Sequence, residues 1–212
     1  MEHTEDATKK RFVGFISART SSSRFPQKAL KTIRGRTVFE HIIDRAKAAD
    51  SLDEVVLTTS DQPEDDILQE LAEKKGIRVW RGSLKDKLDR WRGAAKAFDA
   101  YAIITIDGDD VFCDPELISH GVEQMRKSGA DFIYAPKALA CGSFTYGLTR
   151  SALEKVCDIK DSGDTELIER YFLETGLFKT EEFIARDSIF LNPDIRLTLD
   201  YPEDLAFFSR IF

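Results

Sequence analysis

Apolar and polar positions along the first part of the chain form two kinds of segment. Short apolar runs, typical of strands buried on both faces of a sheet, predict strands over 12–18, 54–59, 77–80, 101–106 and 131–135. Between these runs apolar residues recur at helical spacing, which predicts helices over 37–49, 64–75 and 84–98 and from residue 114 onward. Alternating strands and helices are typical of a mostly parallel sheet with helices on both faces.

Polar residues at the predicted helix ends agree with these boundaries. Thr37 and Glu40 have the spacing of a capping box, in which each side chain bonds the backbone of the other. Gly76 follows the second helix, where a left-handed residue commonly ends a helix. Asp114 and Pro115 place a cap and a first-turn proline at the start of the fourth helix.

The rest of the chain is less regular. We expect strands over 144–149, 180–189 and 196–200, and helices over 164–175 and 202–211. No repeat, low-complexity tract or linker divides the sequence. The domain prediction is therefore a disordered tail at 1–10 and a single domain at 11–212, within which 136–190 is a less regular subregion.

Composition narrows the classes of function. Hydrophobic residues make up 42% of the 212 residues, enough for a full core. The net charge of -7 argues against nucleic acid as a partner, because that binding needs a basic face. The three cysteines lack CxxC spacing and favour reduced thiols in the cytoplasm, and no apolar run is long enough to span a membrane.

In a parallel sheet of this kind, ligands bind beyond the carboxyl ends of the strands. The loop after the first predicted strand carries Arg19, Arg24 and Lys28 among several hydroxyl side chains. An arginine guanidinium can donate two hydrogen bonds to phosphate oxygens, and a lysine ammonium and serine hydroxyls can bind further oxygens of a triphosphate. A solvated basic loop is an equally good reading of these residues alone.

Two further loops carry carboxylates. Asp107, Asp109 and Asp110 follow the strand at 101–106, and Asp200 follows the late predicted strand. Such carboxylates suit a Mg²⁺ ion that also takes phosphate oxygens. The alternatives are ordinary turn chemistry in the first loop and a capping box between Asp200 and Glu203 in the second.

Four segments, in order, resemble the motifs of the CMP-sugar synthetases, which include the deoxyoctulosonate and acylneuraminate cytidylyltransferases. They are Phe15 to Leu30, Arg81-Gly82-Ser83 with Leu88-Asp89-Arg90-Trp91, Gly108-Asp109 with Asp114-Pro115-Glu116, and Leu199-Asp200-Tyr201-Pro202-Glu203-Asp204. The likeness is strongest to the spore-coat-polysaccharide branch of that family. Gln27 departs from it where glycine is usual, and Asp110-Val111 departs where a proline often follows.

The resemblance implies a Rossmann-like nucleotidyltransferase fold of the glycosyltransferase-A-like kind, a three-layer sandwich around a mostly parallel sheet. It implies transfer of CMP from CTP to a sugar acid or related small anionic acceptor, with release of pyrophosphate, for surface-polysaccharide or glycoconjugate precursors. It implies Mg²⁺ on Asp109 and Asp200. The implied catalytic residues are Arg19, Lys28, Asp109 and Asp200. The expected nucleotide-binding residues are Ala18, Arg19, Ser22, Ser23, Arg24, Lys28, Arg90 and Asp107, and a surface role for Arg90 stays an alternative.

The subregion at 136–190 resembles the family least, so we expect acceptor selection there. Ser143 and Tyr146 are the candidates for acceptor binding, although Tyr146 also suits a core position. Members of the family often form homodimers, and this subregion could supply such an interface.

Three rival functions stay open. A metal-dependent glycosyltransferase would use Asp107-Gly108-Asp109 as its Asp-x-Asp triplet. A nucleotidyltransferase could act on a phosphosugar, a polyol phosphate or a phosphonate. A relative without activity could serve as a binding or assembly subunit. The basic first loop favours a free triphosphate over a nucleotide-sugar.

Overall fold

The computed structural model describes residues 10–165 and 167–212, so the predicted tail at 1–10 lies outside the described residues except for Lys10. A seven-stranded sheet has the order β5-β4-β1-β6-β8-β7-β9. Within this sheet, as far as the structure describes it, only β8 runs antiparallel to its neighbours, which confirms the mostly parallel sheet. The strands are β1 (Phe12–Ser17), β4 (Glu54–Ser60), β5 (Arg78–Gly82), β6 (Ala102–Asp107), β7 (Phe132–Tyr134), β8 (Tyr146–Thr149) and β9 (Thr180–Glu182). The short strands β2 (Thr32–Ile33) and β3 (Arg36–Thr37) form a separate pair.

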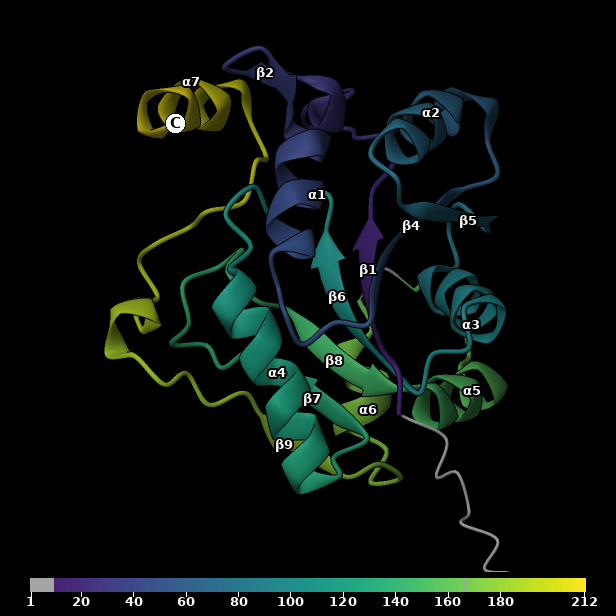
Figure 1. Cartoon of the computed structure of the whole chain (residues 1–212). Coiled ribbons are helices and arrows are strands. Elements are labelled where there is room, and N and C mark those ends of the chain that lie inside the picture. The colour runs from purple at the N-terminus through teal and green to yellow at the C-terminus, as the bar shows by residue number, and fades with distance from the viewer. Residues whose placement is uncertain (1–9, 166) are drawn as a thin grey trace, which may run out of the picture.

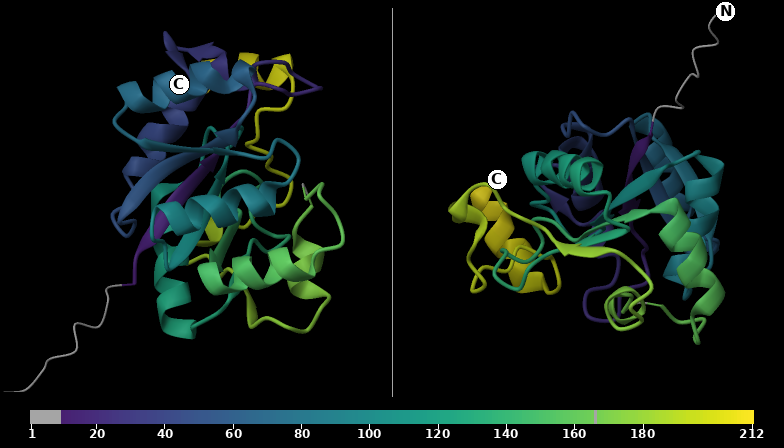
Figure 2. Two further views of the ribbon diagram at one scale, coloured as in Figure 1. Left: turned by 90° about the vertical axis from the view of Figure 1, so that its right-hand side faces the viewer. Right: turned by 90° about the horizontal axis from the view of Figure 1, so that it is seen from below.

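Helices cover both faces of this sheet (Figure 1). The helices α1 (Val38–Lys47), α2 (Asp66–Lys74) and α4 (Pro115–Ser128) share one core cluster. The other face carries α3 (Lys87–Ala97), α5 (Arg150–Ile159) and α6 (Glu169–Leu173). The closing helix α7 (Pro202–Ile211) lies near β2, and short 3₁₀ turns occupy Lys28–Leu30, Pro63–Asp65 and Ser188–Phe190. The three-layer sandwich is therefore confirmed, and Figure 2 shows the layers from two other sides.

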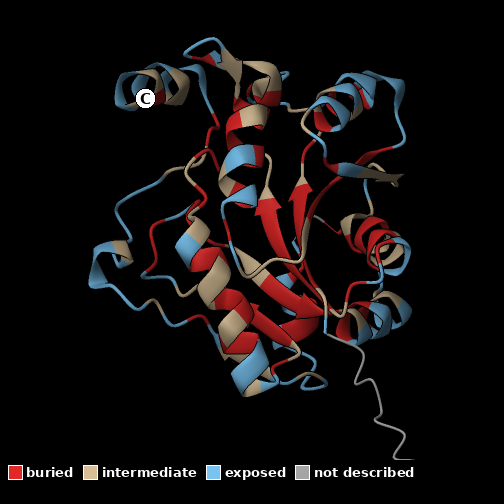
Figure 3. Cartoon of the chain, viewed as in Figure 1, coloured by how far each residue is buried: buried red, intermediate tan, exposed pale blue. Residues whose placement is uncertain are grey.

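The alternation of side chains along β1 explains why both faces are covered. Phe12 and Ile16 belong to the cluster under α1 and α4, while Val13 and Phe15 belong to the cluster under α3 and α5. All four side chains are fully buried, and each such burial stabilises the fold by roughly 1.5–3 kcal/mol. Figure 3 shows the buried strands as the continuous centre of the molecule.

The predicted helix caps are confirmed. The Thr37 hydroxyl accepts a hydrogen bond from the Glu40 N–H, and the Glu40 carboxylate accepts one from the Thr37 N–H. Asp114 caps α4 by accepting from the N–H groups of Glu116 and Leu117. Gly76 has φ +70°, as expected for a residue just past a helix.

The second half contains most of the corrections. Helix α5 (Arg150–Ile159) was not expected, and the helix predicted at 164–175 is reduced to α6. The strand predicted at 180–189 ends at Glu182 in β9. The strand predicted at 196–200 is reduced to one parallel bridge between Cys141 and Arg196.

Across the residues that the structure describes, no helix combines the length and the apolar character that crossing a bilayer requires.

Candidate active site

A pocket of about 790 Å³ opens at the carboxyl ends of β1 and β6. In the register of the sheet Ser17, the last residue of β1, lies between Thr58 and Asp107. The chain moves outward from β1 through β4 to β5 and then returns to the other side of β1 with β6. A crevice forms where the strand order reverses in this way, and ligands bind there in open α/β sheets.

The pocket is strongly basic within an acidic protein. Six cationic side chains and two carboxylates line it, although the whole chain carries a net charge of -7. The cations are Arg19, Arg24, Lys28, Lys85, Lys87 and Arg90. The clustered charge favours a polyanionic ligand, because like charges gathered in a cleft focus the local field.

The first loop is held in place by one buried carboxylate, Asp65. The N–H and the hydroxyl of Thr20 both donate to Asp65 Oδ1, each at 2.7 Å. Thr59 and Ser60 donate to Oδ2 from the end of β4. Burial alone raises the pKa of Asp65, but the hydrogen bonds from Ser60 and Thr20 outweigh it and hold the pKa below its ordinary value. This anchor fixes the start of the loop, so that the following side chains face the pocket.

Gln27 occupies a backbone conformation that favours glycine. Its φ is +55° and its ψ is +30°, which is the left-handed region. Its N–H donates to the Thr20 carbonyl at 3.1 Å and closes the loop. The departure from the usual glycine therefore leaves the turn intact, at a conformational cost of roughly 1 kcal/mol. Lys28 follows directly and begins the first 3₁₀ turn.

Gly108 allows the loop after β6 to approach the first loop closely. A Cβ atom at this position would lie 2.7 Å from the Ala18 Cβ and 2.9 Å from the Ser17 carbonyl oxygen. The Gly108 N–H also donates to that oxygen at 2.8 Å. The absence of a side chain at this residue brings Asp107 and Asp109 against the end of β1.

Lys28 joins the two predicted metal ligands. Its ammonium contacts Asp109 Oδ2 and lies 3.4 Å from Asp200 Oδ1. The three side chains are only 13%, 22% and 12% exposed for Lys28, Asp109 and Asp200 respectively. Burial and the charge of Asp107 raise the pKa of Asp109, while the Lys28 ammonium acts against them. The structure therefore brings together three of the four predicted catalytic residues.

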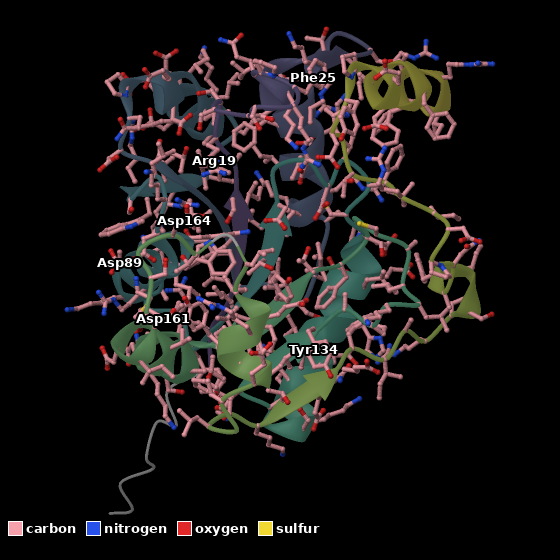
Figure 4. The ribbon with its side chains drawn as sticks, turned by 180° about the vertical axis from the view of Figure 1, so that it is seen from behind. Arg19, Phe25, Asp89, Tyr134, Asp161 and Asp164 are labelled. Atoms are coloured by element: carbon pink, nitrogen blue, oxygen red, sulfur yellow. The ribbon has the colours of Figure 1, made fainter. Side chains whose placement is uncertain are left out.

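The fourth predicted catalytic residue, Arg19, also lines the pocket and donates to the Leu84 carbonyl at 3.1 Å. It is labelled in the view from behind, between the loop that carries Phe25 and the segment of Asp164 (Figure 4). Ala18, Ser22, Ser23, Arg24, Arg90 and Asp107 also line the pocket. All the predicted nucleotide-binding residues are therefore gathered at one cleft.

Asp200 is surrounded by donors and is not a helix cap. Arg24 lies 2.7 Å from Oδ1, while Arg196 and the Thr198 hydroxyl reach Oδ2 at 3.3 and 2.9 Å. The alternative of a capping box between Asp200 and Glu203 is wrong. Asp204 accepts from the N–H groups of Asp200 and Tyr201 at the start of α7 instead. Asp200 does not line the pocket itself, but Arg24 and Lys28, which do, connect its carboxylate to the pocket wall.

The loop after β6 contains two further carboxylates in different settings. Asp107 lies 2.8 Å from the Lys87 ammonium, which also stacks over the ring of Trp91. Asp110 is buried and accepts from the Thr145 hydroxyl at 3.3 Å. Burial, followed by the charges of Asp107 and Asp109, raises the pKa of Asp110 well above its usual value. Asp110 therefore serves packing within the loop, while Asp107 faces the pocket.

A second basic wall comes from the segment between β5 and α3. Asp86 caps α3 by accepting from the Asp89 N–H at 3.1 Å. The same carboxylate pairs with Lys160 and accepts from the buried Thr165 hydroxyl at 3.0 Å. These contacts of Asp86 fix the position of the neighbouring backbone, and Lys85 and Lys87 lie on either side of it.

The two predicted acceptor-binding residues do not line this pocket. The Ser143 hydroxyl is buried and donates to the Ala140 carbonyl at 2.7 Å, which is a structural role. The Tyr146 ring packs 5.4 Å from that of Phe132, and its hydroxyl donates to Glu169 at 3.0 Å. Burial, together with the charge of Glu169, raises the pKa of Tyr146.

Sequence reasoning missed Lys85, Lys87 and Asp65. The available signal for the two lysines was their position directly after β5, whose carboxyl end lies at the same edge of the sheet as those of β1 and β6. Asp65 gave no signal, because its role depends on contacts with a loop far away in the sequence.

The donors at Asp109 and Asp200 suit a Mg²⁺ ion that completes its coordination with a substrate. Both carboxylates contact the Lys28 ammonium, and Asp200 also pairs with Arg24 and Arg196. Among the described residues no three His, Cys, Asp or Glu side chains gather as a ready-made metal cluster. Magnesium is commonly bound by one or two carboxylates together with phosphate oxygens, so the two residues fit that mode.

Comparison with known proteins agrees with this geometry. The family model described as cytidylyltransferase matches residues 13–211. The spore coat polysaccharide biosynthesis protein SpsF of Bacillus subtilis is 29% identical over 93% of this chain and 84% of that protein. A 3-deoxy-manno-octulosonate cytidylyltransferase of Leptospira interrogans is 30% identical over 70% of this chain and 60% of that protein.

Solved structures extend the likeness to the fold. A cytidylyltransferase from Leptospira borgpetersenii superposes with a TM-score of 0.86 at 25% identity, over 94% of this chain and 85% of that chain. The family match, the three-layer fold and the basic pocket at the ends of β1 and β6 agree, and the chain belongs to the cytidylyltransferase family.

Proposed function

We propose that this protein transfers CMP from CTP to a sugar acid and releases pyrophosphate, as a step towards a surface polysaccharide or another glycoconjugate. The observation that carries the proposal is the basic first loop, whose Arg24 and Lys28 line the pocket beside Asp109 and also pair with Asp200. The similarity to SpsF and to an octulosonate cytidylyltransferase supports a sugar-like acceptor.

In this mechanism an acceptor oxygen attacks the α-phosphorus of CTP, and the bond to the leaving pyrophosphate breaks. Arg19, Arg24 and Lys28 bind the triphosphate and stabilise the negative charge that the leaving group gains. The backbone near Ala18 faces the cytosine. Enzymes of phosphoryl-group transfer act mainly by positioning and charge stabilisation, and the pocket supplies both.

The proposal includes Mg²⁺, which Asp109 and Asp200 would hold. A bound Mg²⁺ neutralises phosphate charge and lowers the pKa of an acceptor hydroxyl. The chain's own part would be to present these two carboxylates, which Lys28 joins, to the bound ion. The homodimer and the cytoplasmic location stay predictions.

The test is a pyrophosphate-release assay with each of the four NTPs, Mg²⁺ and a panel of ulosonic acids, phosphosugars, polyol phosphates and phosphonates. The expected result is release that requires both CTP and a sugar acid. Release with another NTP would contradict the assignment of CTP, and release with a phosphorylated acceptor would contradict the assignment of a sugar acid. Silence with every NTP, together with cleavage of a nucleotide-sugar, would identify a glycosyltransferase instead.

Variants test the assigned residues. Asp109→Asn and Asp200→Asn should each lower kcat by at least about 100-fold, because each removes a charge placed where the transition state needs it. Asp99→Asn is the matched control, because Asp99 lies before β6, at the other end of the sheet, and its side chain is 83% exposed. Near-wild-type turnover of both site variants would reject the assignment.

A further inference from the structure

The Lys28 ammonium lies between the two carboxylates of the proposed metal site. It contacts Asp109 and lies 3.4 Å from Asp200, so a single positive charge lies between the two carboxylates proposed to hold a metal. Lysine has three donors and no acceptor, and it can serve two carboxylates at once. In the nucleotide-free protein this ammonium is the positive charge at the place assigned to Mg²⁺.

The surroundings show why a cation is needed there. The Asp109 and Asp200 side chains are 22% and 12% exposed, and the charge of Asp107 acts on Asp109 as well. Uncompensated carboxylates in such a setting are costly, because each has lost much of its hydration. Lys28 therefore stabilises the empty site, and the same contacts oppose entry of a second cation.

The lysine has a clear alternative position. Its backbone is fixed, since the Lys28 N–H donates to the Phe25 carbonyl at 3.2 Å. Its flexible four-carbon stem ends in a pocket of about 790 Å³ that Arg19 and Arg24 also line. A triphosphate in that pocket would offer the ammonium new anionic partners within reach of the same backbone position.

We infer that Lys28 acts as an internal cation that occupies the metal position until a triphosphate draws it away. This inference concerns the regulation of the proposed site and rests on the proposed function. The metal alone binds weakly, because its entry would leave the Lys28 ammonium beside a divalent ion. The triphosphate alone binds weakly, because Asp109 would then lose the ammonium that pairs with it and Asp200 would lose one of its three cationic partners, Lys28, Arg24 and Arg196. Metal and nucleotide consequently bind with positive coupling.

The experiment measures Mn²⁺ alone, without nucleotide, by electron paramagnetic resonance and by calorimetry. Lys28→Met should bind Mn²⁺ at least about tenfold more tightly than the wild type, because the opposing charge is gone. Lys28→Arg keeps the charge and should bind as weakly as the wild type. Lys85→Met removes one positive charge from the wall of the same pocket and should change Mn²⁺ affinity by less than about threefold.

Thermal unfolding provides a second readout. Lys28→Met should melt at a lower temperature than the wild type without metal, and Mn²⁺ should restore more stability to it than to the wild type. If Lys28→Met does not fold, Lys28→Gln, which keeps donors for both carboxylates, takes its place in both measurements.

Equal Mn²⁺ affinity in Lys28→Met and the wild type would overturn the inference, as would an equal gain in Lys85→Met. These measurements use no CTP and no acceptor. A protein that failed the pyrophosphate assay could still show the tighter Mn²⁺ binding of Lys28→Met, so failure of the proposed function and failure of this inference are distinguishable.

Discussion

Substitution of Gly108 by alanine tests the close approach between the two loops of the site. The added Cβ would lie 2.7 Å from the Ala18 Cβ, 2.8 Å from the Ala18 Cα and 2.9 Å from the Ser17 carbonyl oxygen. None of these atoms is the end of a flexible side chain, so the ends of β1 and β6 must separate. The hydrogen bond from the Gly108 N–H to Ser17, at 2.8 Å, would lengthen with them.

Two contributions determine how much Gly108→Ala lowers the free energy of unfolding. Overpacking in a tightly packed place costs about 1–3 kcal/mol, and the weakened hydrogen bond adds roughly 1 kcal/mol. We therefore expect Gly108→Ala to lower the free energy of unfolding by about 2–4 kcal/mol, or the melting temperature by on the order of 10 °C. Asp109 moves with the loop, so kcat should fall by more than the stability loss alone explains.

The assay is urea unfolding followed by circular dichroism, with CTP turnover measured at a temperature where the variant is folded. Gly163→Ala is the matched control, since nothing lies within 4 Å of a Cβ at that residue, and it should stay within about 0.5 kcal/mol of the wild type. If Gly108→Ala kept both its stability and its turnover, the steric reasoning would be refuted.

Three further predictions concern the first loop and the acceptor side. Asp65→Asn should cost about 2–4 kcal/mol at pH 7. Because its pKa is lowered, the Asp65 carboxylate gives stability that is present above the unfolded value of about 3.9 and is lost as the pH falls through the folded value. Urea unfolding should therefore show the difference between the variant and the wild type shrinking as the pH falls below about 3.9, and a constant difference would contradict this reasoning. Gln27→Val should destabilise the protein by about 1–2 kcal/mol, because the left-handed backbone at φ +55° opposes a β-branched side chain. Gln27→Gly should not destabilise it, because glycine suits this backbone. Equal melting temperatures of the two variants would contradict this reasoning. Ser143→Ala should lower the free energy of unfolding by about 1 kcal/mol, because it removes a buried hydrogen bond, and should leave the KM for the acceptor unchanged. A tenfold rise in that KM at unchanged stability would instead support an acceptor-binding role for Ser143.

The first half of the fold could be predicted because its signals are local. The strand predicted at 12–18 and the helix predicted at 37–49 agree with β1 and α1 to within two residues at each end, since apolar runs and caps fix both elements. Helix α5 carried similar signals: Thr149 caps it, and Ala152, Leu153 and Val156 are its buried face. The helix was missed because the preceding strand was predicted to end at Thr149, the residue that caps the helix, and no turn separates the two elements.

The site was predictable where it depends on strand ends and not where it depends on tertiary contacts. Arg19, Lys28 and Asp109 follow strands that lie side by side, so their meeting follows from the sheet. Asp200 was related to Asp109 through a strand predicted at 196–200, which the structure reduces to one bridge, and through the family resemblance. The hydrogen bonds that turn Ser143 inward and anchor the first loop on Asp65 join segments whose pairing no local pattern indicates.

The Leu199 N–H donates to the Asp109 carbonyl at 2.9 Å, so a main-chain hydrogen bond ties the segment before Asp200 to the loop after β6. This contact joins residues that are synthesised far apart in time. A growing chain can complete β1, β4 and β6 and still lack Asp200 until the segment at 196–200 emerges. The two carboxylates proposed to hold a metal would therefore meet only after these strands are complete, and a chain interrupted before Asp200 would carry the pocket with Asp109 alone.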